Sequence, residues 1–114
     1  MNDKELADRV VALGVEEIGQ TDFRYTLTKG IGTAYMMPEI FVRDWRVAGA
    51  LMERAVKQDL WFNLFQDAHD QKRCVIDLMY GPDNKEITDM ASDRSLPRAI
   101  IEACVEALQE QIRE

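Results

Sequence analysis

The single histidine, His69, is the residue around which metal or acid–base chemistry would have to be built. It lies in the sequence DAHD between Asp67 and Asp70, and carboxylates beside an imidazole are a common set of metal ligands. Three polar side chains in a row are also typical of a tight turn between strands. Because there is no second histidine and no Cys pair at ligand spacing, we favour the turn and predict no metal. Any other role of these three residues stays open.

The two cysteines, Cys74 and Cys104, are the candidate nucleophiles. A pair formed by Cys74 and His69 would need an accessible thiolate with a lowered pKa. Each cysteine instead falls on the apolar side of its own periodic segment, where a reduced Cys acts as a small hydrophobe. The chain also lacks GxSxG, HExxH and Walker sequences. We therefore predict structural cysteines, no cofactor and no enzymatic activity.

An acidic row on the last helical segment is the one surface feature that stands out. Glutamates recur there at four-residue steps, at Glu102, Glu106, Glu110 and Glu114. Neighbouring like charges at this spacing typically destabilise a helix by roughly 0.2–0.5 kcal/mol per pair. The row is either a solvated face that keeps the protein soluble or a stripe that docks on Lys and Arg of a partner. These four residues are the predicted protein-binding site.

Composition and charge narrow the choice of partner. The chain has 114 residues, of which 46% are hydrophobic and 31% charged, which suits one domain over residues 1–114 with a core of its own. The net charge of −7 argues against direct binding of nucleic acid or of an anionic membrane, so a partner with a basic surface is expected. The N-terminal sequence has no apolar signal region, which predicts a cytoplasmic protein.

The N-terminal third begins with a helix and continues less clearly. Asn2 or Asp3 can cap a helix that runs to about Leu13, and Gly14 is placed to end it. Residues 15–37 form the poorly defined segment. Within it, Phe23, Tyr25 and Leu27 alternate with polar residues as in a strand with one wet face. The sequence GIG at positions 30–32 reads as a turn, because no phosphate-loop context surrounds it.

The clearest periodic signal in the chain predicts one long central helix. Pro38 opens it, and Phe41–Lys57 continues it, because a proline is tolerated in a first turn. Apolar residues follow at three- and four-residue steps. They are Phe41, Trp45, Ala48, Leu51, Met52 and Ala55. We expect this stripe, led by Trp45, to be buried.

The remaining segments predict a small antiparallel sheet and a closing helix. Leu60–Phe65 and Arg73–Tyr80 read as a hairpin, with Val75 and Met79 either in the core or on a patch for a partner. Residues 81–84 form a turn, Lys85–Met90 a weaker strand and residues 92–95 a loop. The last helix begins with Ser95 and Pro97 and carries an apolar band, Ile100, Ile101, Cys104, Val105, Leu108 and Ile112. The fold class is therefore α+β, in the order α-(β)-α-β-β-(β)-α.

This order of elements resembles the phage ABA-sandwich domain family of small phage and prophage proteins of uncharacterised function. The resemblance rests on DWRVAGALMER around Trp45, on the aromatic strand with Trp61, and on SLPRAIIEACVEAL at Ser95–Leu108. The small polar residue, the proline and the Ala-Ile pair that open the last helix match Ser95, Pro97, Ala99 and Ile100. The resemblance covers Pro38–Leu108, omits residues 15–37, implies an α/β/α sandwich, and transfers no catalytic residue.

Two functional hypotheses follow. The first is an acidic, non-enzymatic phage or prophage accessory protein in the host cytosol that binds a host or phage protein, for example to inhibit a host defence or regulatory complex. The alternative is a phage structural or assembly protein that acts as a homo-oligomer through a sheet face or a sheet edge. Neither hypothesis identifies the partner or the oligomeric state.

Overall fold

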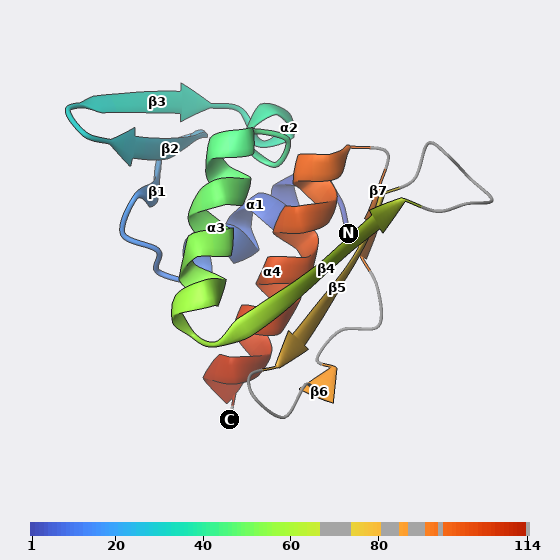
Figure 1. Ribbon diagram of the computed structural model, residues 1–114. Coiled ribbons are helices and arrows are strands. Elements are labelled where there is room, and N and C mark those ends of the chain that lie inside the picture. Colours follow the sequence, from blue (N-terminus) through green and yellow to red (C-terminus); the bar gives the residue numbers. More distant parts are fainter. Residues whose placement is uncertain (67–73, 81–84, 87–90, 94, 114) are drawn as a thin grey trace.

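The computed structural model describes the backbone of residues 1–66, 74–80, 85–86, 91–93 and 95–113, and the side chains of residues 1–60 and 95–110. Its elements follow the order α1-β1-β2-β3-α2-α3-β4-β5-β6-β7-α4 (Figure 1). Their class is α+β, as the sequence predicted. His69 with Asp67 and Asp70, the predicted turn at 81–84, and Glu114 lie outside the described residues.

Helix α1, Asp3–Ala12, begins and ends where the sequence predicted. The Asn2 side chain accepts a hydrogen bond of 2.8 Å from the backbone N–H of Glu5, which satisfies a donor that the first turn leaves unpaired. After the helix, Gly14 adopts a φ of 71°, a conformation that favours glycine. Leu6, Ala7 and Val10 are its buried residues.

The segment that the sequence left poorly defined, 15–37, contains a three-stranded antiparallel meander, here called sheet A. Its strands are β1 (Ile18–Thr21), β2 (Arg24–Lys29) and β3 (Gly32–Met36). The register pairs Ile18 with Leu27 and Leu27 with Ala34, so these three residues share one face. Tyr25 and Leu27 are buried as predicted, whereas Phe23 is 85% exposed. Phe23 lies in the turn that joins β1 and β2, so the alternation of the strand does not reach it.

The predicted central helix is two helices, and this corrects the sequence interpretation. Helix α2, Pro38–Phe41, ends before Asp44, and helix α3, Trp45–Lys57, begins after it. The Asp44 side chain accepts a hydrogen bond of 2.7 Å from the backbone N–H of Arg46. Asp44 is thus the N-cap of α3, because its extended backbone starts a new helix and does not continue the old one.

Trp45 is not buried, which is a second correction. It is 59% exposed, while Phe41 is fully buried. Because the helix is interrupted between these residues, Phe41 and Trp45 do not lie on the same face of one continuous helix. The buried stripe of α3 consists of Val47, Ala48, Leu51 and Ala55.

Sheet B is the predicted hairpin extended by two short strands. Strands β4 (Leu60–Gln66) and β5 (Cys74–Tyr80) pair antiparallel in a register that places Leu60 opposite Tyr80. Strands β6 (Lys85–Glu86) and β7 (Ala91–Asp93) pair with opposite ends of β5. Ser92 and Asp93, which the sequence placed in a loop, lie in β7 because they pair with β5. The side chains of Val75 and Met79 lie outside the described part of the structure.

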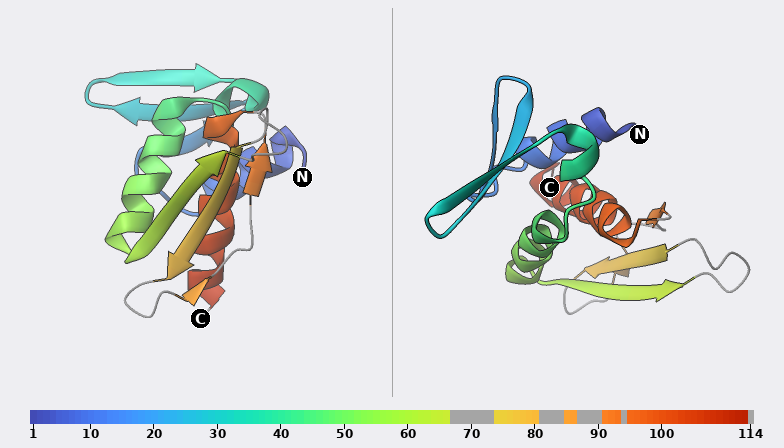
Figure 2. Two further views of the ribbon diagram at one scale, coloured as in Figure 1. Left: turned by 45° about the vertical axis from the view of Figure 1, so that its right-hand side comes forward. Right: turned by 90° about the horizontal axis from the view of Figure 1, so that it is seen from above.

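The layer order differs from the α/β/α sandwich that the resemblance implied. Helix α4, Leu96–Arg113, packs beside α3, and these two helices contact sheet B. Helices α1 and α2 contact sheet A on the other side. Seen from above, the helices lie between the two sheets (Figure 2). The physical reason is the 15–37 segment, which lies outside the resemblance and forms a second sheet against α1 and α2.

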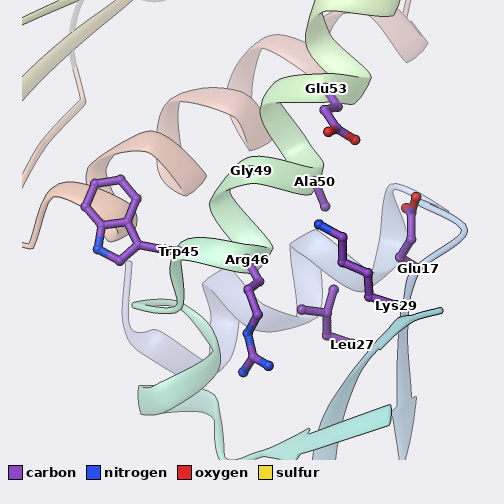
Figure 3. Close-up of a pocket in the computed structure, with 8 residues that line it drawn as sticks. All are labelled: Glu17, Leu27, Lys29, Trp45, Arg46, Gly49, Ala50 and Glu53. Atoms are coloured by element: carbon purple, nitrogen blue, oxygen red, sulfur yellow. The ribbon is translucent and has the colours of Figure 1, made fainter. Parts of the chain in front are cut away.

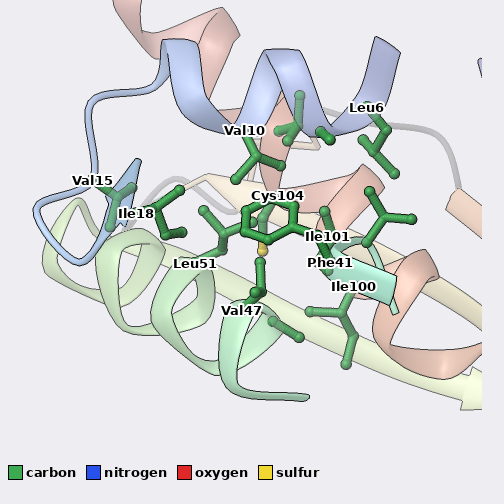
Figure 4. Close-up of a cluster of buried hydrophobic side chains, with 14 of the residues drawn as sticks. Leu6, Val10, Val15, Ile18, Phe41, Val47, Leu51, Ile100, Ile101 and Cys104 are labelled. Carbon is green, nitrogen blue, oxygen red and sulfur yellow. The ribbon is translucent and has the colours of Figure 1, made fainter. Parts of the chain in front are cut away.

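Helix α4 is the centre of the hydrophobic core. Figure 4 shows Ile100, Ile101 and Cys104 of α4 between Leu6 and Val10 of α1 and Val47 and Leu51 of α3. The Ser95 hydroxyl accepts a hydrogen bond of 3.4 Å from the N–H of Arg98, so the predicted cap is confirmed. Ile100, Ile101, Cys104, Val105 and Leu108 of the predicted apolar band are buried, and the side chain of Ile112 lies outside the described part.

Candidate functional site

A groove lies between helix α3 and strand β2 of the described structure. We call it the α3–β2 groove, and its volume is about 310 Å³, which is at the lower end for ligand sites. Eight residues line it: Glu17, Leu27, Lys29, Trp45, Arg46, Gly49, Ala50 and Glu53. A second hollow, lined in part by Gly32, Thr33 and Ala34, shares Leu27, Lys29 and Arg46 and continues the groove along β3.

The local structure explains why the groove exists. Gly30 adopts a φ of 64° in the turn that joins β2 to β3, so this hairpin extends beside α3. Leu27 and Lys29 point from the sheet toward α3, and Arg46 points from α3 toward the sheet (Figure 3). The ring of Trp45 points away from Leu27 and Lys29, so Trp45 borders the groove and does not fill it.

Two small residues of α3 keep the groove open. Gly49 and Ala50 line it on the helix side. A Cβ atom placed on Gly49 would have no other atom within 4 Å, so no packing requirement of this chain explains the glycine. Glycine inside a helix is less stable than alanine by about 1 kcal/mol. The chain therefore carries a destabilising residue at a place where it leaves room for another molecule.

The rim of the groove is charged, and most of its charges are unpaired. Arg46 forms two hydrogen bonds with Asp44, from Nε at 3.1 Å and from Nη2 at 2.9 Å. These bonds hold the pKa of the Asp44 carboxyl below its usual value. In contrast, Lys29, Glu17 and Glu53 form no ion pair with any residue whose side chain is described. An apolar floor with two cations and two carboxylates around it suits a polypeptide segment.

Helix α3 has a second apolar face, which the sequence pattern did not distinguish from the buried one. Trp45, Gly49, Met52 and Val56 follow one another at steps of four, three and four residues, the spacing of a helix–helix contact. We call these four residues the α3 seam. Trp45 and Val56 are each 59% exposed, and a shallow hollow lies over Met52 and Val56. The apolar pattern of the sequence therefore describes two faces of α3, of which the chain covers one.

The acidic row lies on the open side of α4, but its members differ. Glu102 is partly buried and pairs with Arg98 at 3.1 Å. Glu106 and Glu110 are exposed, and Glu114 is beyond the described residues. Glu102 is thus engaged within the chain, because Arg98 is a buried cation that needs carboxylates around it.

The other candidate residues show no reactive arrangement where the structure describes them. Burial raises the pKa of the Cys104 thiol to about 12, so this cysteine stays protonated and is part of the core. Cys74 pairs through its backbone with Gln66 and Asp93, and its side chain is outside the described part. Within the described ranges, no group of three or more His, Cys, Asp or Glu side chains could hold a metal ion.

No helix in the described part of the chain has both the length and the apolar character that a membrane crossing requires. Comparison with protein-family models, with characterised proteins and with solved structures finds no match to this chain.

Proposed function

We propose that this protein is a non-enzymatic accessory protein that acts by binding another protein, with the α3–β2 groove as the place where a segment of the partner lies. The observation that carries the proposal is the combination of an apolar floor with unpaired charges on the rim. Leu27, Gly49 and Ala50 form the floor, while Lys29 and Glu53 beside it form no ion pair with a described side chain.

The charges indicate the chemistry of the segment. An extended peptide with an apolar side chain over Leu27 would place an acidic residue near Lys29 and a basic residue near Glu17 or Glu53. Such pairing at a rim sets register and specificity more than affinity. The basic residue agrees with a partner that is attracted by the net charge of −7.

The setting of this function is a phage or prophage protein in the host cytosol, as the resemblance implies. Its most concrete form is inhibition of a host defence or regulatory complex. The acidic residues Glu106 and Glu110 of α4 remain a second contact surface for the same partner, because both are exposed.

The test is site-specific photo-crosslinking in the bacterial host. A photoreactive residue replaces Lys29 in the groove, Arg24 on the same strand but outside the groove lining, or Glu106 in the acidic row. We expect one crosslinked protein from position 29 and none from position 24. With that protein purified, Lys29→Glu should weaken binding by about tenfold, whereas the control Arg24→Glu should leave it unchanged. Crosslinking from position 106 alone would assign binding to the acidic row and overturn the groove.

A structural or assembly protein that acts as a homo-oligomer is the alternative function. One observation favours it, the apolar α3 seam exposed at Trp45 and Val56.

A further inference from the structure

The face of α3 that the chain leaves open is apolar along three turns. The seam runs from Trp45 to Val56, which spans roughly 16 Å along the helix axis. Its two end residues are exposed and Met52 is partly exposed. On one side of the seam lie Ala48 and Ala55, both fully buried in the core. The other side carries Arg46 and Glu53, which are exposed and line the α3–β2 groove.

The order of side-chain sizes along the seam is self-complementary. In an antiparallel pair of α3 helices whose two-fold axis passes midway between Gly49 and Met52, each Met52 lies opposite the Gly49 of the other copy. Trp45 then lies opposite Val56. A large side chain therefore faces a smaller one at each of the four contacts, and the space around Gly49 accepts the methionine.

The charges on the open flank are self-complementary in the same arrangement. In an antiparallel helix pair, each flank meets the same flank of the other copy. Arg46 and Glu53 lie on this flank, about 20° apart around the helix. The two-fold axis brings Arg46 of one copy beside Glu53 of the other, with an offset of roughly 3 Å along the axis. Arg46 uses only Nε and Nη2 on Asp44, so among the described residues its Nη1 remains a donor for a second carboxylate.

We propose that the α3 seam is a self-association surface, on which a second copy of this chain docks through its own α3 in the antiparallel direction. Apolar contact of Trp45 with Val56 and of Met52 with Gly49 supplies the core of the interface. Two symmetric ion pairs between Arg46 and Glu53 fix its direction, because a parallel arrangement would not bring these opposite charges together across the axis. A contact of this length is small, which gives a dimer that dissociates on dilution.

A charge exchange tests the proposal on the purified protein. Sedimentation velocity of the wild type, from micromolar to millimolar concentration, should show the mass rise from 13.1 kDa toward twice that value. Arg46→Glu and Glu53→Arg each replace both ion pairs by like-charge contacts, so each variant should dimerise about tenfold or more weakly. An equimolar mixture of the two variants restores both opposite-charge contacts and should form a heterodimer with the wild-type affinity.

Controls separate this result from a general effect of charge or of folding. Arg24→Glu makes the same change of charge on β2 and should dimerise as the wild type does. Arg46 and Glu53 are both solvent-exposed, and thermal unfolding by circular dichroism should show that each variant folds. A wild-type mass of 13.1 kDa at every concentration would overturn the proposal. So would single variants that associate normally, or a mixture that stays monomeric. Because the measurement uses the purified protein without a partner, a negative result would not bear on the proposed binding of a partner segment in the α3–β2 groove.

Discussion

The Nε of Arg98 donates a hydrogen bond of 2.9 Å to Oδ1 of Asp3 and thereby joins the start of helix α4 to the start of helix α1. Arg43 donates to the other oxygen of Asp3 at 2.7 Å. Arg98 also donates to Glu102 and to the backbone carbonyl of Met1. The Arg98 side chain is only 9% exposed, so these partners replace the water that a buried guanidinium loses.

We expect Asp3→Asn to lower the free energy of unfolding by about 1–3 kcal/mol at pH 7, because a buried cation loses a charged partner. Urea denaturation measures this change. Glu16→Gln is the matched control, since Glu16 is exposed and forms no ion pair with a described residue. An equal loss in both variants would contradict a specific role of the Asp3–Arg98 pair.

The same carboxyl makes stability depend on acid pH. The hydrogen bond from Arg43, and also that from Arg98, hold the pKa of Asp3 below its ordinary value of 3.8. A group whose pKa is lowered in the folded state stabilises the fold above its unfolded pKa, and this stabilisation is lost as pH falls through the folded pKa. Between about pH 5 and about pH 2, the free energy of unfolding of the wild type should therefore fall more than that of Asp3→Asn. Urea titrations at each pH measure this difference. Parallel curves for the two proteins would contradict the assignment.

Tyr25→Phe should remove a partly buried hydrogen bond and leave the ring in place. The Tyr25 hydroxyl donates to Asp8, and its ring stacks on Phe41 with centroids 5.1 Å apart. Loss of a hydrogen bond to a carboxylate should lower the free energy of unfolding by about 1–2 kcal/mol. Tyr35→Phe is the control, because Tyr35 is exposed and should not change stability.

Tyr25 also predicts a loss of stability in alkali. Burial, and then the hydrogen bond to Asp8, raise the pKa of Tyr25 from 10.0 to about 12. The protonated form is thus favoured by folding, so its stabilisation is complete below pH 10 and is lost as pH rises toward 12. From about pH 9 to about pH 11, the free energy of unfolding should fall less in Tyr25→Phe than in the wild type. A fall of the same size in both proteins would exclude Tyr25 as the titrating group.

Gly49→Ala should raise the free energy of unfolding by about 0.5–1 kcal/mol, because alanine stabilises a helix and the added Cβ meets no atom. Chemical denaturation at low protein concentration measures the monomer. The reverse exchange on the next residue, Ala50→Gly, should lower stability by a similar amount. A less stable Gly49→Ala variant would mean that the groove is closed in solution.

Phe41→Ala and Trp45→Ala should differ strongly, although the sequence places both residues on one stripe. Phe41 is fully buried and Trp45 is 59% exposed. Removing the Phe41 ring should cost about 3–5 kcal/mol, whereas removing the Trp45 ring should cost about 1 kcal/mol or less. Thermal melts or urea titrations give the comparison, and Phe41→Leu replaces Phe41→Ala if the latter does not fold. Equal losses would restore the single buried helix that the sequence predicted.

The local elements followed from the sequence because their signals act over a few residues. The cap at Asn2, the positive φ at Gly14, the proline at the start of α2 and the cap at Ser95 all lie where the sequence placed them. Each of these features satisfies or replaces a backbone hydrogen bond within one turn of helix, so nearby residues suffice to specify it. The hairpin of β4 and β5 and the burial of Cys104 were predicted in the same way from alternation and periodicity.

Tertiary structure alone decided which apolar faces are covered. The α3–β2 groove joins Glu17, Leu27 and Lys29 to residues of α3, a proximity that no spacing along the chain specifies. The apolar pattern of α3 has two faces, and the sequence by itself determined that both exist. Only the packing of α1, α4 and the two sheets determined that Leu51 is buried and that Trp45 is left for another molecule, because burial depends on which segments meet in space.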